Sequence, residues 1–100
     1  MPPATAIRGA TYDPALAWTL HPQVSLRPES FGALAYHFGT RRLSFLKSPL
    51  LLSVVRSLAE QPSGDAACMA AGVPADQRAT YERALATLAE SGMICERVPA

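Results

Sequence analysis

The sequence has few of the residues that enzymes use for chemistry. Its 100 residues include only two cysteines and two histidines, and the eight acidic residues are scattered along the chain. Cys68 and Cys95 form no CxxC pair, and no acidic residue accompanies His21 or His37 at metal-ligand spacing. Structural roles for these side chains are the simpler interpretation, with both thiols reduced. We therefore predict a protein that is not an enzyme and holds no metal.

Other absences narrow the class of protein further. The six glycines form neither a GxGxxG nor a GxxxxGK phosphate-binding motif. No apolar run approaches the roughly 20 residues that span a bilayer, and the N-terminus lacks the basic start and apolar stretch of a signal peptide. A net charge of +1 argues against a protein held to DNA mainly by phosphate contacts. The sequence thus predicts a cytoplasmic protein that binds neither membrane nor nucleic acid.

The composition does support a folded core. A hydrophobic fraction of 49% in 100 residues is enough for one small domain. We predict a flexible N-terminal arm at residues 1–19, a folded domain at residues 20–95 and a C-terminal tail at residues 96–100. Trp18 is an exception within the arm, because we expect its ring to lie against the core.

The first half of the folded domain predicts three short antiparallel strands. Residues 23–27 alternate polar and apolar, and Pro28 is expected to end that strand. Residues 32–38 are fairly apolar on both sides, which is typical of a strand that is central or covered on both faces. Residues 39–41 predict a hairpin turn in which Gly39 is free to take a positive φ. The third strand is expected at residues 42–47.

The second half predicts three helices. Ser48 and Pro49 are typical of a helix start, and an apolar stripe follows as far as Leu58. A short Ala-rich helix is expected at residues 64–71, with Ser63 as its cap and Gly72 as its left-handed end. The longest helix is expected from about Pro74 to Ser91, and its predicted inward stripe consists of Tyr81, Leu85, Leu88 and Ala89. Three strands followed by three helices predict an α+β domain with its helices on one side of the sheet.

The third strand has two interpretations of equal weight. Arg41, Arg42 and Lys47 bracket the apolar segment Leu43–Leu46. Charges beside an edge strand can simply discourage aggregation. Alternatively, they select an acidic peptide that adds itself to the sheet as a further strand.

Several segments resemble one known family. These are HPQV from His21, RPE from Arg27, FGALAYHFGTRRLSFLKSP from Phe31 to Pro49 and LAESGMI from Leu88 to Ile94. They are similar to the mycofactocin precursor-peptide chaperones, which belong to the superfamily of RiPP recognition elements related to the pyrroloquinoline quinone peptide chaperone. The likeness covers about Trp18 to Ile94.

The resemblance implies a winged-helix-turn-helix-like domain that works as an adaptor. In the superfamily, the leader of a ribosomally made precursor peptide docks between the third strand and the last helix. The implied partners are a short glutamate-rich precursor and a radical SAM maturase, which would itself hold the iron–sulfur clusters and S-adenosylmethionine, so this chain needs no cofactor. An acidic precursor favours a recognition role for the basic residues. The predicted peptide-binding residues are Arg41, Arg42, Leu43, Ser44, Phe45, Leu46, Lys47, Arg78, Tyr81, Glu82 and Leu85.

Two other functions are weighed against the adaptor. A winged-helix DNA-binding regulator would use its last helix for reading, but Gln77, Arg78 and Arg83 there alternate with acidic residues. A small hydrolase or redox enzyme would depend on His37 or Cys68, and alanine at either position is expected to leave activity intact.

Overall fold

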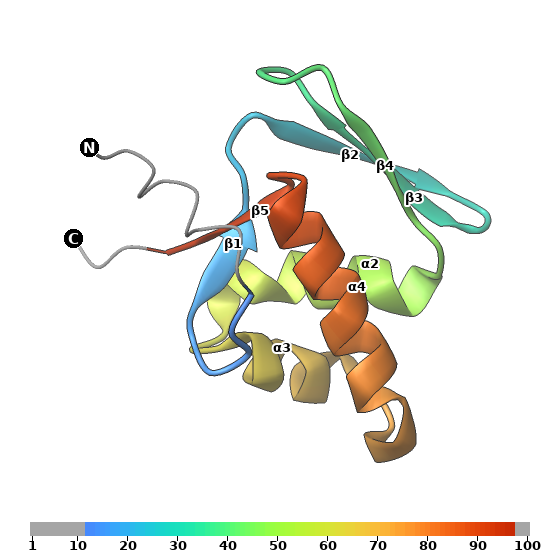
Figure 1. The fold of residues 1–100 in the computed structure, drawn as a ribbon. Helices are drawn as coiled ribbons and strands as arrows, with labels where there is room; N and C mark the ends of the chain where they lie inside the picture. Colours follow the sequence, from blue (N-terminus) through green and yellow to red (C-terminus); the bar gives the residue numbers. More distant parts are fainter. Residues whose placement is uncertain (1–11, 98–100) are drawn as a thin grey trace.

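Two antiparallel sheets and three α-helices make up residues 12–97, the part of the chain that the computed structural model describes (Figure 1). The elements in chain order are β1 (Trp18–Leu20), β2 (Val24–Glu29), β3 (Gly32–His37), β4 (Leu43–Leu46), α2 (Pro49–Ser57), the 3₁₀ turn η1 (Leu58–Glu60), α3 (Gly64–Ala71), the 3₁₀ turn η2 (Ala75–Gln77), α4 (Arg78–Glu90) and β5 (Ile94–Glu96). The α+β class with an antiparallel sheet is confirmed. The strict order of three strands and then three helices is wrong, because β1 precedes the three strands and β5 follows the helices.

The main sheet has the order β2–β3–β4, so the second predicted strand is central as expected. Alternation along β3 sends Ala33, Ala35 and His37 to the inner face, where all three are buried. Tyr36 points to the outer face and is exposed, as is Phe38 just beyond the strand. Only the face with small side chains is covered by the helices. Small residues there allow the helical layer to approach the strand closely.

Pro28 does not end its strand, contrary to prediction. It lies within β2 and is paired with Ala33. The Phe38 N–H donates to the Gln23 carbonyl, and alternation from that bond turns the backbone nitrogen of Pro28 away from β3. Because β2 is an edge strand, the missing N–H interrupts no hydrogen bond of the ladder.

The turn between β3 and β4 also differs from its predicted geometry. Arg41, and not Gly39, takes the left-handed conformation, with φ 63°. His37 organises this turn through its side chain, since its Nδ1 accepts the N–H groups of Gly39 and Thr40 at 3.0 and 3.1 Å. The Arg41 N–H donates to the His37 carbonyl at 2.7 Å. Those contacts place the left-handed residue two positions later than the glycine.

The predicted helix caps are confirmed. The Ser48 hydroxyl accepts the Leu51 N–H at the start of α2, and Ser63 does the same for Ala66 at the start of α3. Gly72 ends α3 with φ 89°. Satisfying the otherwise unpaired N–H groups of a first turn typically stabilises a helix by about 1 kcal/mol. Local side-chain chemistry therefore determines these boundaries.

Trp18 anchors the start of the described chain to the core. Its side chain is fully buried, and its Nε1–H donates to the Asp13 carbonyl at 2.8 Å. The ring of Tyr12 lies beside it, with centroids 5.1 Å apart. The predicted packing of Trp18 is thus confirmed. The predicted arm boundary at residue 19 is corrected, because residues 12–19 belong to the fold; residues 1–11 and 98–100 lie outside the described part.

The predicted tail boundary at residue 96 also shifts, since Glu96 belongs to β5 and pairs with Trp18. Arg97 follows, and its guanidinium donates to three backbone carbonyls. Nε reaches the Trp18 carbonyl and Nη1 the Ala59 carbonyl, each at 3.1 Å, and Nη2 donates to Gln61. One side chain therefore joins β1 to the end of η1.

Arg97→Ala is expected to lower the free energy of unfolding by about 1–3 kcal/mol, because it removes charge-assisted hydrogen bonds to these carbonyls. Thermal unfolding followed by circular dichroism measures the effect as a lower Tm. Arg83→Ala is the matched control: Arg83 is exposed on α4, and among residues 12–97 its guanidinium donates only to the Thr80 hydroxyl. Equal Tm values for the two variants would contradict the assigned role of Arg97.

Candidate functional site

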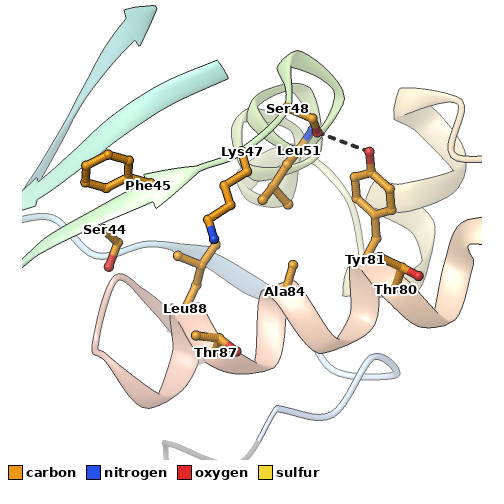
Figure 2. Close-up of a pocket in the computed structure, with 10 residues that line it drawn as sticks. All are labelled: Ser44, Phe45, Lys47, Ser48, Leu51, Thr80, Tyr81, Ala84, Thr87 and Leu88. Atoms are coloured by element: carbon orange, nitrogen blue, oxygen red, sulfur yellow. Dashed lines mark hydrogen bonds between the residues drawn. The ribbon is translucent and has the colours of Figure 1, made fainter. Parts of the chain in front are cut away.

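A groove of about 770 Å³ runs between the free edge of β4 and one face of α4 (Figure 2). Its lining residues come from two segments that are distant in sequence, residues 44–51 and residues 80–88. They are Ser44 and Phe45 of β4, Lys47 and Ser48 after that strand, Leu51 of α2, and Thr80, Tyr81, Ala84, Thr87 and Leu88 of α4. The volume is suited to a few side chains of an extended peptide.

The edge of β4 supplies unpaired backbone groups along this groove. Within the described residues, β4 has β3 as its only strand neighbour. The His37 N–H donates to the Arg42 carbonyl at 2.9 Å, and alternation from that bond turns Ser44 and Leu46 toward β3. The N–H and C=O groups of Leu43 and Phe45 therefore face the open side. A guest strand can pair with them in the way that peptides extend an exposed sheet edge.

The opposite wall of the groove is a stripe of α4. Thr80, Tyr81, Ala84, Thr87 and Leu88 recur at helical spacing and share one face. The small side chain of Ala84 leaves space between the larger Tyr81 and Leu88 (Figure 2). Apolar side chains of a guest can enter there, and the threonine hydroxyls offer polar contacts.

The end of the groove near α2 is held by a hydrogen bond. The Ser48 and Tyr81 hydroxyl oxygens are 3.1 Å apart, so the cap of α2 is tied to α4 (Figure 2). Lys47 extends from the end of β4 toward Leu88 across the opening (Figure 2). Its side chain is exposed and brings a positive charge over an otherwise mainly apolar cavity.

Four of the predicted peptide-binding residues line the groove, namely Ser44, Phe45, Lys47 and Tyr81. Arg41, Arg42 and Leu43 are exposed beside it, in the turn and at the start of β4. Phe45 belongs to both surfaces: it is part of the groove lining, but strand alternation places its ring on the outer face, opposite Leu34.

The other four predicted residues do not line the groove. Leu46 and Leu85 are almost fully buried in the core, so they support the walls and do not face a guest. Arg78 turns toward α3 and forms an ion pair with Asp65 at 2.6 Å. Glu82 is partly buried and lies outside the lining. On α4 the groove lining therefore overlaps the predicted residues only at Tyr81, and their role in binding a peptide stays a prediction.

Six lining residues were not predicted as peptide-binding: Ser48, Leu51, Thr80, Ala84, Thr87 and Leu88. A usable signal was present on α4, where small or hydroxyl side chains recur at positions 80, 84 and 87 beside the buried stripe. Such residues allow close approach of a guest backbone. The tilt of α4 against β4, which decides whether this stripe is open, cannot be read from helical periodicity.

The histidines and cysteines have structural surroundings. His21 and His37 lie with ring centroids 4.4 Å apart, and the His21 Nδ1 accepts the Gln23 N–H. Burial, and then the neighbouring His37, lower the pKa of His21. Burial raises the pKa of both the Cys68 and the Cys95 thiols, which keeps them protonated and poorly nucleophilic. Within residues 12–97, His, Cys, Asp and Glu side chains never gather in threes at metal-binding distance.

The last helix is poorly suited to reading DNA. Arg78 is paired with Asp65, and Arg83 follows directly after Glu82, so the positive field along α4 is weak. The helices of the described chain are also too short or too polar to cross a membrane.

An unpaired sheet edge that borders an open groove beside a helix defines a peptide-recognition domain. A family model for the Peptide chaperone MftB family matches residues 17–95. The chain belongs to that family, and the resemblance seen in the sequence is confirmed.

Curated relatives agree with this assignment. The chain is 56% identical to the peptide chaperone MftB of Mycobacterium ulcerans over 93 residues, which cover 92% of this chain and 85% of that protein. It is 55% identical to the peptide chaperone MftB of Mycolicibacterium smegmatis over 84 residues, covering 84% of this chain and 82% of the relative. For the protein of that name in Mycobacterium tuberculosis, the identity is 50% over 97 residues, with coverage of 95% and 89%. No solved structure matches the chain significantly.

Proposed function

We propose that this chain is a peptide chaperone that holds the leader of a short glutamate-rich precursor and presents it to a radical SAM maturase in mycofactocin biosynthesis. The observation that carries the proposal is the free edge of β4 beside the groove of α4. Family membership and relatives named as peptide chaperones support the same role. A chaperone is not an enzyme, and the chain makes no covalent step.

The leader would bind as a further strand on β4. Its backbone would pair with the outward N–H and C=O groups of Leu43 and Phe45, and alternate side chains would enter the groove beside Ala84. Arg41, Arg42 and Lys47 lie exposed along this path, where they would attract glutamate side chains. The arrangement of the main sheet and three helices supports a winged-helix-like domain for this peptide-binding role.

The energetics would favour moderate affinity. A disordered leader loses conformational freedom on binding, and this loss offsets much of the gain from backbone pairing and a few apolar contacts. Tethering the leader would raise the effective concentration of the precursor's far end at the maturase. The iron–sulfur clusters and S-adenosylmethionine would be held by the maturase, and both proteins would meet in the cytoplasm.

Filling the groove tests this function. Ala84→Trp places a large ring between Tyr81 and Leu88, so it is expected to weaken binding of a synthetic leader peptide about tenfold or more, or about 1.4 kcal/mol. Isothermal titration calorimetry measures the affinity, and circular dichroism confirms that the variant is folded.

Ala79→Trp is the matched control, because Ala79 is exposed on α4 and lies outside the groove lining. It is expected to bind the leader with wild-type affinity. Equal affinity of wild type and both variants would show that the leader does not use this groove. Binding of random duplex DNA that weakens with salt would instead support the DNA-binding alternative.

A further inference from the structure

The outer face of the main sheet carries an apolar patch that the groove does not use. Phe38 is 61% exposed, Phe45 54% and Leu43 52%, and two further exposed rings lie nearby, Phe31 in the β2–β3 turn and Tyr36 on β3. With roughly 200 Å² for each aromatic side chain, the exposed parts of the four rings amount to on the order of 400 Å² of apolar surface, and Leu43 adds to this. Patches of this size on a small protein are commonly functional. We call these five residues the outer patch.

The outer patch is continuous across β3 and β4. Phe31 stacks on Phe45 with centroids 6.0 Å apart, and Tyr36 meets Phe38 edge-on at 5.2 Å. Leu43 lies directly opposite Tyr36 in the strand register, so it connects the two aromatic pairs. The helices cover the inner face only, and thus the patch has no partner within the described chain.

The charge around the outer patch is positive. Residues 24–47 contain four Arg or Lys side chains and one Glu, a net charge of +3, whereas the whole chain carries +1. The single acidic residue, Glu29, is paired with Arg27 at 3.0 Å. Two copies of this chain packed through the patch would bring like charges together. Charge complementarity therefore favours a different protein with an acidic surface.

We propose that the outer patch is a second docking surface, separate from the leader groove, for a folded protein whose apolar contact site is bordered by carboxylates. The proposal rests on the adaptor function, because an adaptor must bind a protein partner and a peptide at once. Phe45 lies where the two surfaces meet, since the residue is part of the groove lining and its ring stacks on Phe31 in the patch. A leader strand added to β4 would extend the outer face, so the partner would contact the leader and the patch together.

Two variants separate the two surfaces. Phe31→Ser combined with Phe38→Ser removes exposed apolar side chains of the patch, lies outside β4 and spares the groove lining. Ala84→Trp blocks the groove and spares the patch. The probes are the purified radical SAM maturase and the synthetic leader peptide, each titrated by calorimetry, with circular dichroism as the check on folding.

The double variant is expected to bind the maturase about tenfold more weakly or worse and to keep its affinity for the leader. Binding of the maturase by the wild-type chain should also weaken as salt is raised. The proposal is overturned if the double variant binds the maturase as the wild type does, if the wild type forms no complex with it, or if sedimentation shows a homodimer that the double variant dissociates. Failure of Ala84→Trp to affect leader binding would instead count against the groove and leave the outer patch standing.

Discussion

Phe45→Pro is expected to abolish leader binding while the domain stays folded. The backbone N–H of Phe45 faces the open side of β4, so its loss breaks no bond to β3. A guest strand would lose one ladder hydrogen bond and would also meet the proline ring. A buried acceptor left without its donor costs about 1–3 kcal/mol, and the added steric clash should bring the loss of affinity to about 100-fold or more.

Calorimetry with the synthetic leader peptide measures this loss, and two further variants define its origin. Phe45→Ala keeps the N–H and removes only the ring, so it is expected to retain most of the affinity. Ser44→Pro removes an N–H that faces β3 and should instead lower the Tm. Similar leader affinity of Phe45→Pro and Phe45→Ala would show that the peptide does not pair with the edge of β4.

Trp18→Ala is expected to produce the largest loss of stability in the domain. The side chain is fully buried, and truncating such a Trp typically costs about 3–5 kcal/mol. Small domains have about 5–15 kcal/mol of stability in total. For a chain of this size, each kcal/mol corresponds to about 4–8 °C, so the Tm should fall by about 15–30 °C.

Thermal unfolding by circular dichroism tests the role of Trp18, and two variants serve as comparisons. Trp18→Phe keeps most of the apolar area but loses the donor to the Asp13 carbonyl, so a smaller fall in Tm is expected. Phe31→Ala removes an exposed ring and should change the Tm little. A Tm of Trp18→Ala close to that of the wild type would show that this segment is the loose arm that the sequence predicted.

The helices were the most predictable part of the fold. Ser48, Ser63 and Gly72 act on backbone groups within a few residues of their own positions, so their effect can be read locally. The pairing of β1 with β5 could not be read in this way. Each strand has only three residues, which is too short for a periodic pattern, and Trp18 and its partner Glu96 are separated by nearly the whole domain.

The main sheet shows that predicting the position of a strand correctly does not determine which of its side chains form a site. Both sides of β3 are apolar in sequence, and only the approach of the helices determines that Ala33 and Ala35 are covered and Tyr36 is not. The same limit applies to α4. Its buried residues Leu85 and Leu88 were predicted correctly, but the open stripe through Ala84 depends on how the helix crosses β4.

The pairing of β1 with β5 places the entry and exit of the domain side by side. The Arg97 N–H donates to the Ala17 carbonyl at 2.9 Å, so the segment that follows β5 lies within one strand spacing of the segment that precedes β1. Neighbouring ends suit a domain for insertion into a loop of a host protein or for circular permutation. With a linker between the segments that flank β1 and β5, new termini could be opened at the exposed Gly39–Thr40 turn, which leaves the leader groove uncut.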